Sequence, residues 1–397
     1  MTSSISEFAT ILRNGKSIRQ STDASGIPIT RIETISNGTI DSSRVGYANL
    51  TLPECEGWLL QEGDILISHI NSTKHLGKCA IYQREPRLLV HGMNLLALRV
   101  DRKKALPQFV YRMLSNSAFR LQIPRITKNS VNQSSFNISN FKKLRIPLPP
   151  LDEQRRIAKI LDATDALRTK RREAIAELDE LVQSVFLDMF GDPVQNPKGW
   201  QVVSGRSAFS ELAYGTSSKA HERQEPGSIP ILRIPNILGG KVDWTHLKYA
   251  VLSERESEKL ILKTDDLLLV RSNGNPDYIA RCARFKSGKS AAFASYLIRC
   301  RIDPRIELSS EFMTALIEFS TFRHRIRREA RTTAGNYNLS IKGIQNFKFI
   351  KPPLDLQSRF AKIVETIEKQ KAQHQKHLDE LDHLFQSLQH RAFQGEL

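Results

Sequence analysis

The sequence predicts an α+β protein: two mixed α/β domains in a pseudo-two-fold arrangement, joined by a long antiparallel coiled coil of two helices. Three observations carry this prediction. The chain of 397 residues repeats itself, each copy opens with short β-branched runs separated by turn residues, and each copy closes with a heptad pattern. A repeat of this size indicates a duplicated structural unit, and the two hydrophobic periods indicate strands and then a helix.

The duplication rests on four collinear matches. Residues 27–41 match residues 229–243 with eight identities in 15 positions. The longest match has 16 identities in 42 positions and contains no gap, pairing 149–190 with 352–393. Two shorter matches lie between them, pairing 63–80 with 265–283 and Ile138–Lys142 with Ile344–Lys348, and the second implies a three-residue shortening before Pro352. This order predicts a first domain at 1–148, a central spacer helix at 149–193, a second domain at 194–351 and a C-terminal spacer helix at 352–397.

Strand and helix signals fill each predicted segment. The runs Ile65–Ile70 and Leu267–Val270 are typical of buried strands, and residues 106–121 favour helix. Each spacer helix follows a Pro-Pro pair, with Asp152 and Asp355 as expected N-caps. Gly191 is expected to end the first of them.

Each spacer helix shows two seam positions of a coiled coil. The seams are apolar at both ends and polar in the middle. In the first helix they comprise Ile157, Thr164, Arg171, Leu178 and Val185, then Ile160, Leu167, Ala174 and Leu181. In the second helix they comprise Phe360, Ile367, His374, Leu381 and Leu388, then Ile363, Gln370, His377 and Leu384. Antiparallel pairing of the two helices would make a rod of roughly 60 Å with a domain near each end.

The charge of the chain points to a polyanion. There are 59 Lys and Arg against 42 Asp and Glu, a net charge of +17, and the pI is about 9.8. Nucleic acid is the simplest partner for such an excess, and a merely basic protein is the alternative that charge alone leaves open. Two reading heads at a fixed distance match two half-sites on duplex DNA.

Composition also bears on the compartment. The four cysteines form no Cys-x-x-Cys pair, so neither structural zinc nor a disulfide framework is expected. The first residues lack the basic start and apolar run of a signal peptide, and no run of 18 uncharged apolar residues occurs. We therefore expect a cytoplasmic protein without a membrane segment.

The chain resembles a known family, the specificity subunits of type I restriction–modification systems. The resemblance covers the order of segments over essentially the whole chain. Its most specific pieces are the Gly63-Asp-Ile-Leu strand entry, residues 146–154 (Ile-Pro-Leu-Pro-Pro-Leu-Asp-Glu-Gln) and residues 391–397 (Arg-Ala-Phe-Gln-Gly-Glu-Leu). Leu356 departs from it, because the first copy has Glu153 at that position.

The resemblance implies a function without catalysis. The two domains would be target-recognition domains, each reading half of a bipartite sequence of double-stranded DNA, and the helices would set the gap. Two adenine-methyltransferase subunits and, for restriction, translocating nuclease subunits would be the partners. No cofactor is expected in this chain, since S-adenosylmethionine and ATP would belong to the partner subunits.

Strings that resemble catalytic motifs lack residues that those motifs require. The string Asn275-Pro-Asp-Tyr278 has Asp where an adenine-binding loop needs Pro, and no cofactor-binding glycine turn precedes it. The Gly-Lys-Ser strings at 15–17 and 288–290 lack the earlier glycine of a P-loop. The histidines after residue 373 have no Cys or acidic partner at ligand spacing, so no metal site is expected.

DNA contacts are predicted in loops that the two copies share. Lys and Arg suit phosphate, and Arg, Asn and Gln suit base edges. The candidates of the first copy are Asn71, Lys74, Lys78, Arg125, Lys128, Asn132 and Gln133. Those of the second copy are Arg271, Asn273, Arg281, Arg325, Arg327, Arg328, Asn336 and Asn338. Arg31 and Arg233, also repeated, could equally be structural ion-pair partners.

Three rival functions remain open. The first is a stand-alone sequence-specific DNA-binding regulator without an enzyme partner. The second is a self-contained methyltransferase, which the missing motifs disfavour. The third is a coiled-coil scaffold that binds no nucleic acid, which the net charge disfavours.

Overall fold

The computed structural model describes residues 2–36, 38–129, 133–286, 288–333 and 335–397. Helices and sheets are mixed, as expected, and the chain divides into two compact units. Unit 1 comprises Met1–Arg172 and Gln375–Leu397, and unit 2 comprises Glu173–His374. Each unit therefore includes part of both long helices, α6 (Leu151–Phe190) and α12 (Leu354–Gln394). The four predicted segments remain a prediction about the domain boundaries.

Unit 1 is built around the four-stranded sheet β2-β8-β5-β7. Its strands are β1 (Thr2–Ser4), β2 (Ala9–Asn14), β3 (Ile27–Ile29), β4 (Gly46–Ala48), β5 (Ile65–Ser68), β6 (Ile70–Asn71), β7 (Cys79–Ile81), β8 (Leu95–Val100), β9 (Lys128–Asn129), β10 (Ser134–Ser135) and β11 (Arg145–Pro147). Its short helices are α1 (Ile5–Phe8), α2 (Leu52–Cys55), α3 (Pro107–Leu114), α4 (Ser117–Arg120) and α5 (Ile138–Lys142), with 3-10 turns η1 (Ile32–Ile35), η2 (Ser42–Arg44), η3 (Glu56–Trp58) and η4 (Ile123–Ile126).

Unit 2 repeats this plan around the six-stranded sheet β13-β22-β18-β20-β16-β15. Its strands are β12 (Gln201–Ser204), β13 (Phe209–Tyr214), β14 (Ile229–Leu232), β15 (Ile237–Leu238), β16 (Gly240–Val242), β17 (Lys248–Ala250), β18 (Leu267–Val270), β19 (Ser272–Asn273), β20 (Cys282–Arg284), β21 (Ala292–Phe293), β22 (Leu297–Ile302), β23 (Arg331–Thr333), β24 (Asn336–Asn338) and β25 (Lys348–Lys351). Its short helices are α7 (Gly205–Ala208), α8 (Glu254–Leu260), α9 (Ser310–Glu318), α10 (Ser320–Glu329) and α11 (Ile341–Asn346), with 3-10 turns η5 (Ile234–Asn236) and η6 (Pro276–Tyr278).

The two predicted strand runs are central strands of these sheets. Leu267–Val270 is β18 without change, and the run from Ile65 is divided into β5 and β6. All four side chains of each central strand are buried, because α3 or α9 covers one face of the sheet and a second apolar cluster covers the other face. The predicted helical stretch 106–121 is also divided, into α3 and α4.

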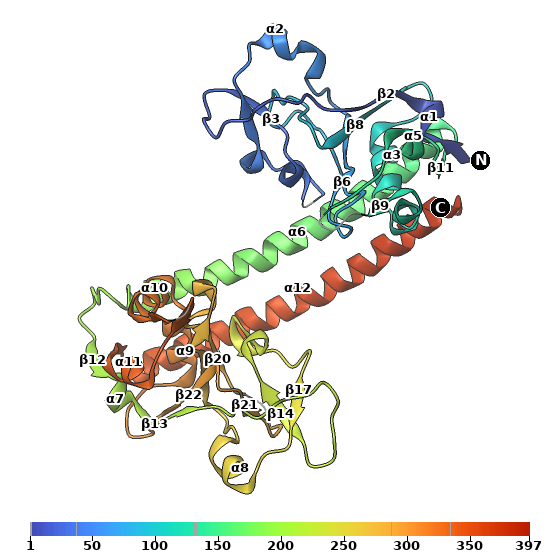
Figure 1. Ribbon diagram of the computed structural model, residues 1–397. Coiled ribbons are helices and arrows are strands. Elements are labelled where there is room, and N and C mark those ends of the chain that lie inside the picture. Colours follow the sequence, from blue (N-terminus) through green and yellow to red (C-terminus); the bar gives the residue numbers. More distant parts are fainter. Residues whose placement is uncertain (1, 37, 130–132, 287, 334) are drawn as a thin grey trace. The chain divides into compact units, whose positions relative to one another are not determined.

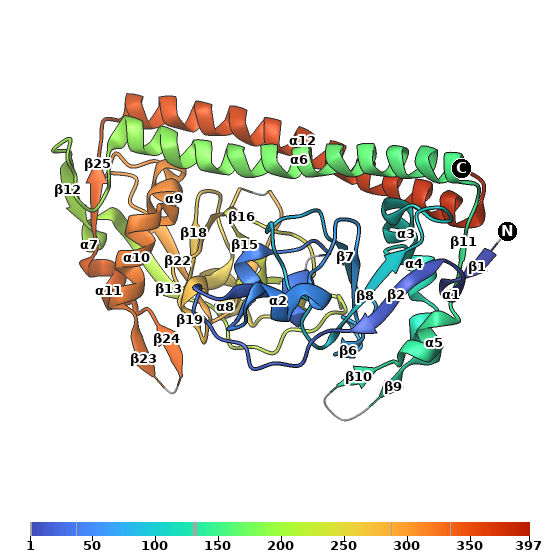
Figure 2. The ribbon, with the colours of Figure 1, turned by 90° about the horizontal axis from the view of Figure 1, so that it is seen from above.

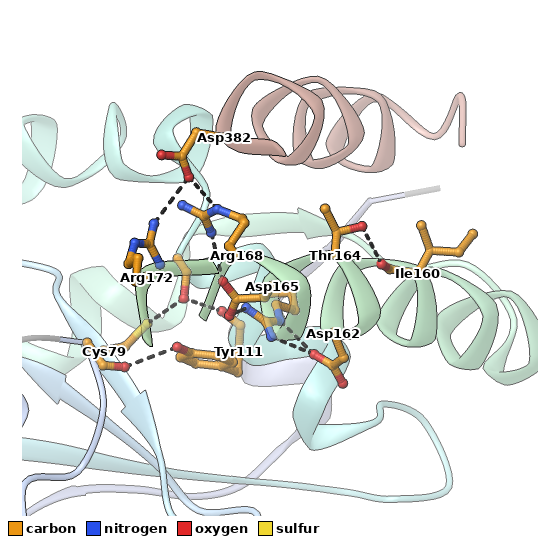
Figure 3. Close-up of polar contacts among 12 residues, drawn as sticks. Cys79, Tyr111, Ile160, Asp162, Thr164, Asp165, Arg168, Arg172 and Asp382 are labelled. Atoms are coloured by element: carbon orange, nitrogen blue, oxygen red, sulfur yellow. Dashed lines mark hydrogen bonds and ion pairs between the residues drawn. The ribbon is translucent and has the colours of Figure 1, made fainter. Parts of the chain in front are cut away.

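The long helices run antiparallel within each unit (Figures 1 and 2). In unit 1, Arg156 of α6 binds the backbone carbonyl of Leu397, whereas Arg168, farther along α6, binds Asp382 (Figure 3). In unit 2, Asp179 binds Lys371 and Phe186 packs on Phe360, its ring centroid 5.7 Å away. Partner numbers fall along α12 as they rise along α6, which defines the antiparallel direction. No helix in the described part of the chain is long and apolar enough to cross a membrane.

The helices begin two residues earlier than the expected N-caps imply. Pro150 and Pro353 are the N-cap residues, since their carbonyls accept the first helical bonds from Gln154 and Gln357. The expected caps, Asp152 and Asp355, lie instead in the first turn, where a negative charge favours the helix dipole. At the other end of α6, Gly191 adopts a φ of +77° after Phe190 and ends the helix, as predicted.

One of the two predicted seams is wrong in both helices. The seam from Ile157 and its equivalent from Phe360 face inward, but the second seam does not: Leu167 is 54% exposed and Leu384 is 48% exposed. The second buried row lies one residue later, and its apolar members include Leu161, Val182, Val364, Leu378 and Phe385. Apolar residues occupy both rows in the sequence, so only packing selects between them.

One of the four repeat matches is also out of register. Asn137 caps α5 and Ser340 caps α11, a spacing of 203 residues. The ends of these segments keep the same spacing, because the carbonyls of Leu144 and Phe347 accept bonds from the starts of α1 and α7. Ile138 therefore corresponds to Ile341, and the three-residue shortening before Pro352 is absent.

Candidate nucleic-acid interface

Each unit carries a short hairpin joined to a strand that follows the central strand. In unit 1 the order is β6-β10-β9, and in unit 2 it is β19-β24-β23. Figure 2 shows that each hairpin extends from its own unit on the side away from the long helices. Almost all the predicted DNA contacts lie on these hairpins or on the loops and helices next to them.

The hairpin of unit 1 is fastened at its root. Ser134 of β10 pairs with both Asn71 and Asn129, and its hydroxyl donates to the Asn129 side chain at 2.9 Å. Thr73 lies 3.0 Å from the same hydroxyl. Lys128 and Gln133 are exposed, and Asn132 lies outside the described residues. The side chain of Asn129 thus supports the hairpin, whereas Asn71 supports it through backbone pairing.

The hairpin of unit 2 is built in the same way. Asn338 of β24 pairs with Ser272, and Tyr337 pairs with Asn273. Asn336 is exposed at the end of β24, whereas Asn338 is half-buried. The side chain of Asn273 accepts a bond of 2.8 Å from the backbone of Asn275 and so holds the following loop.

Basic residues surround the root of the unit 1 hairpin. Lys74, Arg125 and Lys128 are exposed. Lys78 is half-buried and donates to the carbonyl of Ser36 at 2.9 Å. Burial lowers the pKa of Lys78, and the positive charges of Arg120 and Lys74 lower it further. Lys78 therefore has a structural role, while the three exposed side chains are available to a ligand.

Two predicted contacts of unit 2 are engaged within the unit. Arg271 donates to the carbonyl of Ser295 at 3.1 Å and lies over the ring of Tyr214, 4.5 Å from its centroid. Arg281 lies over the ring of Tyr278 at 3.9 Å. Both side chains are half-buried, so they support the loops that they were expected to project from.

The arginines of α10 divide into two groups. Arg323 and Arg327 turn toward η6, where Arg323 donates to the Asp277 carbonyl at 2.8 Å and Arg327 pairs with the Asp277 carboxylate at 3.0 Å. Arg325 and Arg328 line a separate hollow beside the same helix. Neither of these two makes an ion pair in the part of the chain that the structure describes.

An acidic residue that the sequence analysis did not assign explains this division. Glu318, at the end of α9, accepts a bond from the backbone of Cys282 and pairs with Arg323 at 3.5 Å. Burial raises the pKa of Glu318, against the opposing effect of that bond and the arginines. A buried acid next to a run of arginines is the signal that would have marked part of the run as internally neutralised.

The repeated arginines near the start of each unit are structural. Arg31 donates to the side chain of Gln20 at 2.8 Å, and Arg233 donates to the carbonyl of His246 at 2.8 Å. Both hold loops of their own unit. Arg31 also pairs with Glu33, at 3.8 Å.

The motifs considered for catalysis form ordinary local structure. Asn275 caps η6, with its side chain accepting a bond of 2.9 Å from the backbone of Asp277. Among the described residues, no group of three or more His, Cys, Asp or Glu side chains could hold a metal ion.

Comparison with known proteins identifies the same family in sequence and in fold. The family model for the type I restriction modification DNA specificity domain matches residues 1–178. A putative type I restriction enzyme MjaX specificity subunit of Methanocaldococcus jannaschii is 34% identical over 284 residues, which cover 68% of this chain and 65% of that protein. The EcoKI specificity subunit of Escherichia coli is 25% identical over 392 residues, which cover 94% of this chain and 82% of that protein.

The fold agrees with these matches. The crystal structure of a type I restriction–modification S subunit from M. genitalium superposes with a TM-score of 0.57 at 14% identity, covering 99% of this chain and 96% of that one. At this identity the superposition supports the fold, and the sequence matches support the family. The chain belongs to the family of type I restriction–modification specificity subunits.

Proposed function

We propose that this chain is the DNA sequence-specificity subunit of a type I restriction–modification enzyme. Each unit reads one half of a bipartite, asymmetric duplex site. The subunit directs adenine methylation and restriction by partner subunits and performs no catalysis itself. Two methyltransferase subunits bind it for modification, and restriction subunits with translocase activity join them. S-adenosylmethionine and ATP belong to those partners.

The duplicated hairpin is the observation that carries the proposal. Both units present a hairpin at an equivalent place, and basic and amide side chains surround each one. Two-stranded ribbons of this kind fit the major groove, where amides and arginines distinguish bases. The two hairpins differ in sequence, Lys128–Ser135 against Arg331–Asn338. Two different readers in one chain predict an asymmetric target.

The proposed arrangement follows from the duplication and the antiparallel helices. Equivalent units at opposite ends of an antiparallel pair are related by an approximate two-fold axis. The recognition domains are 1–148 and 194–351, and the spacer helices are 149–193 and 352–397. The spacer then sets the number of base pairs between the half-sites.

The test is reconstitution with the cognate modification subunit. The complex is expected to methylate adenine in the presence of S-adenosylmethionine, at a site with two unlike halves and a constant gap. Methylation by the purified chain alone would contradict the proposal. Binding to a specific site without co-purification of a modification subunit would favour the stand-alone regulator.

A hairpin exchange sharpens this test. The segments 128–135 and 331–338 both contain eight residues, so one can replace the other without a change in length. Replacing 128–135 by the second segment should change the bases read in one half-site and leave the other half-site and the gap unchanged. A change in both half-sites would argue against independent reading heads.

A further inference from the structure

The two units share one contact beside the hairpin root. In unit 1, Arg120 of α4 donates to the carbonyl of Lys74 at 3.4 Å. In unit 2, Arg323 of α10 donates to the carbonyl of Asp277 at 2.8 Å. Both members of the contact are separated by 203 residues from their counterparts. The loop and the helix therefore meet in the same way in both units.

The loop residue of this contact carries opposite charges in the two units. The loop residue is Lys74 in unit 1 and Asp277 in unit 2. Ser115 in unit 1 stands where unit 2 has Glu318. In unit 2 these acids pair with the arginines of α10. In unit 1, neither Lys74 nor Arg120 forms an ion pair among the residues that the structure describes.

An electrostatic effect on a neighbouring side chain supports this difference. The positive charges of Lys78, Lys74 and Arg120 lower the pKa of His75, and Lys78 has the largest effect. No carboxylate among the described residues opposes this shift. The loop is therefore a site of uncompensated positive charge, which favours an anion.

A hollow of about 300 Å³ lies at this place. Its apolar floor includes the buried side chains of Leu76 and Ile123. Lys74, Ser117 and Arg120 line it with groups that can donate hydrogen bonds, and Leu121 stands at its edge, 72% exposed. Thr73, another lining residue, contacts the hairpin through Ser134. Charged donors beside apolar surface suit a phosphodiester and its deoxyribose.

We propose that this hollow of unit 1 binds one backbone phosphodiester of the DNA, through Lys74 and Arg120, and that the equivalent place in unit 2 does not. This rests on the proposed function, since it assumes that unit 1 binds DNA with its hairpin. In unit 2, Asp277 is the counterpart of Lys74, and its carboxylate already pairs with Arg327. A phosphate at this place would therefore be repelled by a carboxylate. The two half-sites are consequently bound with different dependence on salt.

The first test is a salt titration of DNA binding by the complex with its modification subunits. Lys74→Gln and Arg120→Gln are expected to lower the salt slope by about one unit for each phosphate that is no longer neutralised. Lys376→Gln removes one exposed charge from α12 in unit 1 and is expected to leave the slope unchanged. Thermal unfolding of each variant checks that the fold is retained. An unchanged slope in both variants would overturn the inference.

The second test works in the opposite direction. Asp277→Asn removes the carboxylate that occupies Arg327, so it should tighten binding at low salt and raise the slope by about one unit. No change in affinity or slope would overturn the assignment of Asp277 as the residue that closes the unit 2 site.

A third test locates the phosphate. Single neutral methylphosphonates are placed along the half-site of unit 1. One position should weaken binding by the wild type and have a much smaller effect on Lys74→Gln/Arg120→Gln. Equal effects on both proteins at every position would contradict the inference. Wild-type complex that fails to bind any bipartite site would contradict the proposed function instead, so the two failures are distinguishable.

Discussion

Arg99 holds the buried carboxylate of Asp64 through two parallel hydrogen bonds, each 2.7 Å long. The same carboxylate accepts a bond of 2.8 Å from the backbone of Gln61. Unit 2 repeats the arrangement with Asp266 and Arg301, whose two bonds are each 2.8 Å long. The aspartate that opens each central strand therefore ties it to the neighbouring strand.

Removing the arginine of this pair should destabilise unit 1. Arg99→Met leaves the Asp64 carboxylate buried without its partner, and breaking a buried pair costs roughly 3–5 kcal/mol, less here because Arg99 is partly exposed. Faster hydrogen exchange in β5 and β8 of the full chain is the expected result. Lys376→Met, which breaks an exposed pair with Glu380, should cost no more than about 0.5 kcal/mol. Equal effects of the two changes would contradict this prediction.

The glutamine of the repeated Pro-Pro motif should be equally important for the junction of domain and helix. Gln154 is fully buried, accepts a bond from the backbone of Leu106 at 2.8 Å, and donates to the carbonyls of Lys104 and Pro149. Gln154→Leu leaves these groups unsatisfied, and we expect the free energy of unfolding in urea to fall by at least about 2 kcal/mol. Gln370→Leu, at an exposed position of α12, is the matched control and should stay within about 0.5 kcal/mol.

Acid should destabilise unit 1 through a buried histidine. Burial lowers the pKa of His69 from 6.5 to about 4, and its Nδ1 has no partner among the described residues. The folded state therefore keeps His69 neutral while the unfolded state takes up a proton below pH 6.5, so stability falls as the pH falls from 6.5 toward 4. One such group contributes up to about 1.4 kcal/mol per pH unit.

The measurement is the free energy of unfolding from pH 7 to pH 5. His69→Leu should flatten this dependence, and part of it should remain because burial also lowers the pKa of His91 to about 4. His390→Leu, at an exposed position, should leave the dependence as it is in the wild type. A His69→Leu profile identical to that of the wild type would contradict the assignment.

The two groups of α10 arginines should respond differently to substitution. Arg325→Ala with Arg328→Ala should weaken DNA binding and lower the salt slope by about one unit for each phosphate left without a cation, with little effect on thermal unfolding. Arg323→Ala leaves the buried Glu318 without its partner, so it should lower the unfolding temperature of unit 2. A lower unfolding temperature in the first variant would show that its side chains are structural.

The length of the spacer helices should determine the gap between half-sites. Deleting one heptad from each helix, residues 169–175 and 375–381, keeps the buried rows in phase and shortens the pair by about 10 Å, equivalent to about three base pairs. Methylation mapping should show a shorter gap and unchanged half-sites. Deletion from α6 alone should disrupt the pairing of the two helices and abolish methylation by the complex. An unchanged gap in the double deletion would contradict the spacer role.

Local patterns were sufficient for the main outline of the fold. Four hydrophobic side chains in succession predicted the central strand β18, and a Pro-Pro pair followed by a heptad pattern predicted both long helices to within a few residues. The short third match of the repeat was misaligned because Ile138–Lys142 shares four of five residues with Ile344–Lys348 but only one with Ile341–Gln345, its counterpart in the fold. The cap bonds of α5 and α11 reveal the register that the fold adopts.

The sequence by itself determined that the chain is a duplication, where its long helices lie, and to which family it belongs, because these depend on residues close together in the chain. Tertiary structure decided which charges are free. Asp277 lies 46 residues from Arg323 in the chain, yet its carbonyl is 2.8 Å from that side chain. Charge pairing depends on distance in space. The sequence alone therefore could not separate the paired arginines of α10 from the unpaired ones, nor show that Lys74 and Arg120 lie together.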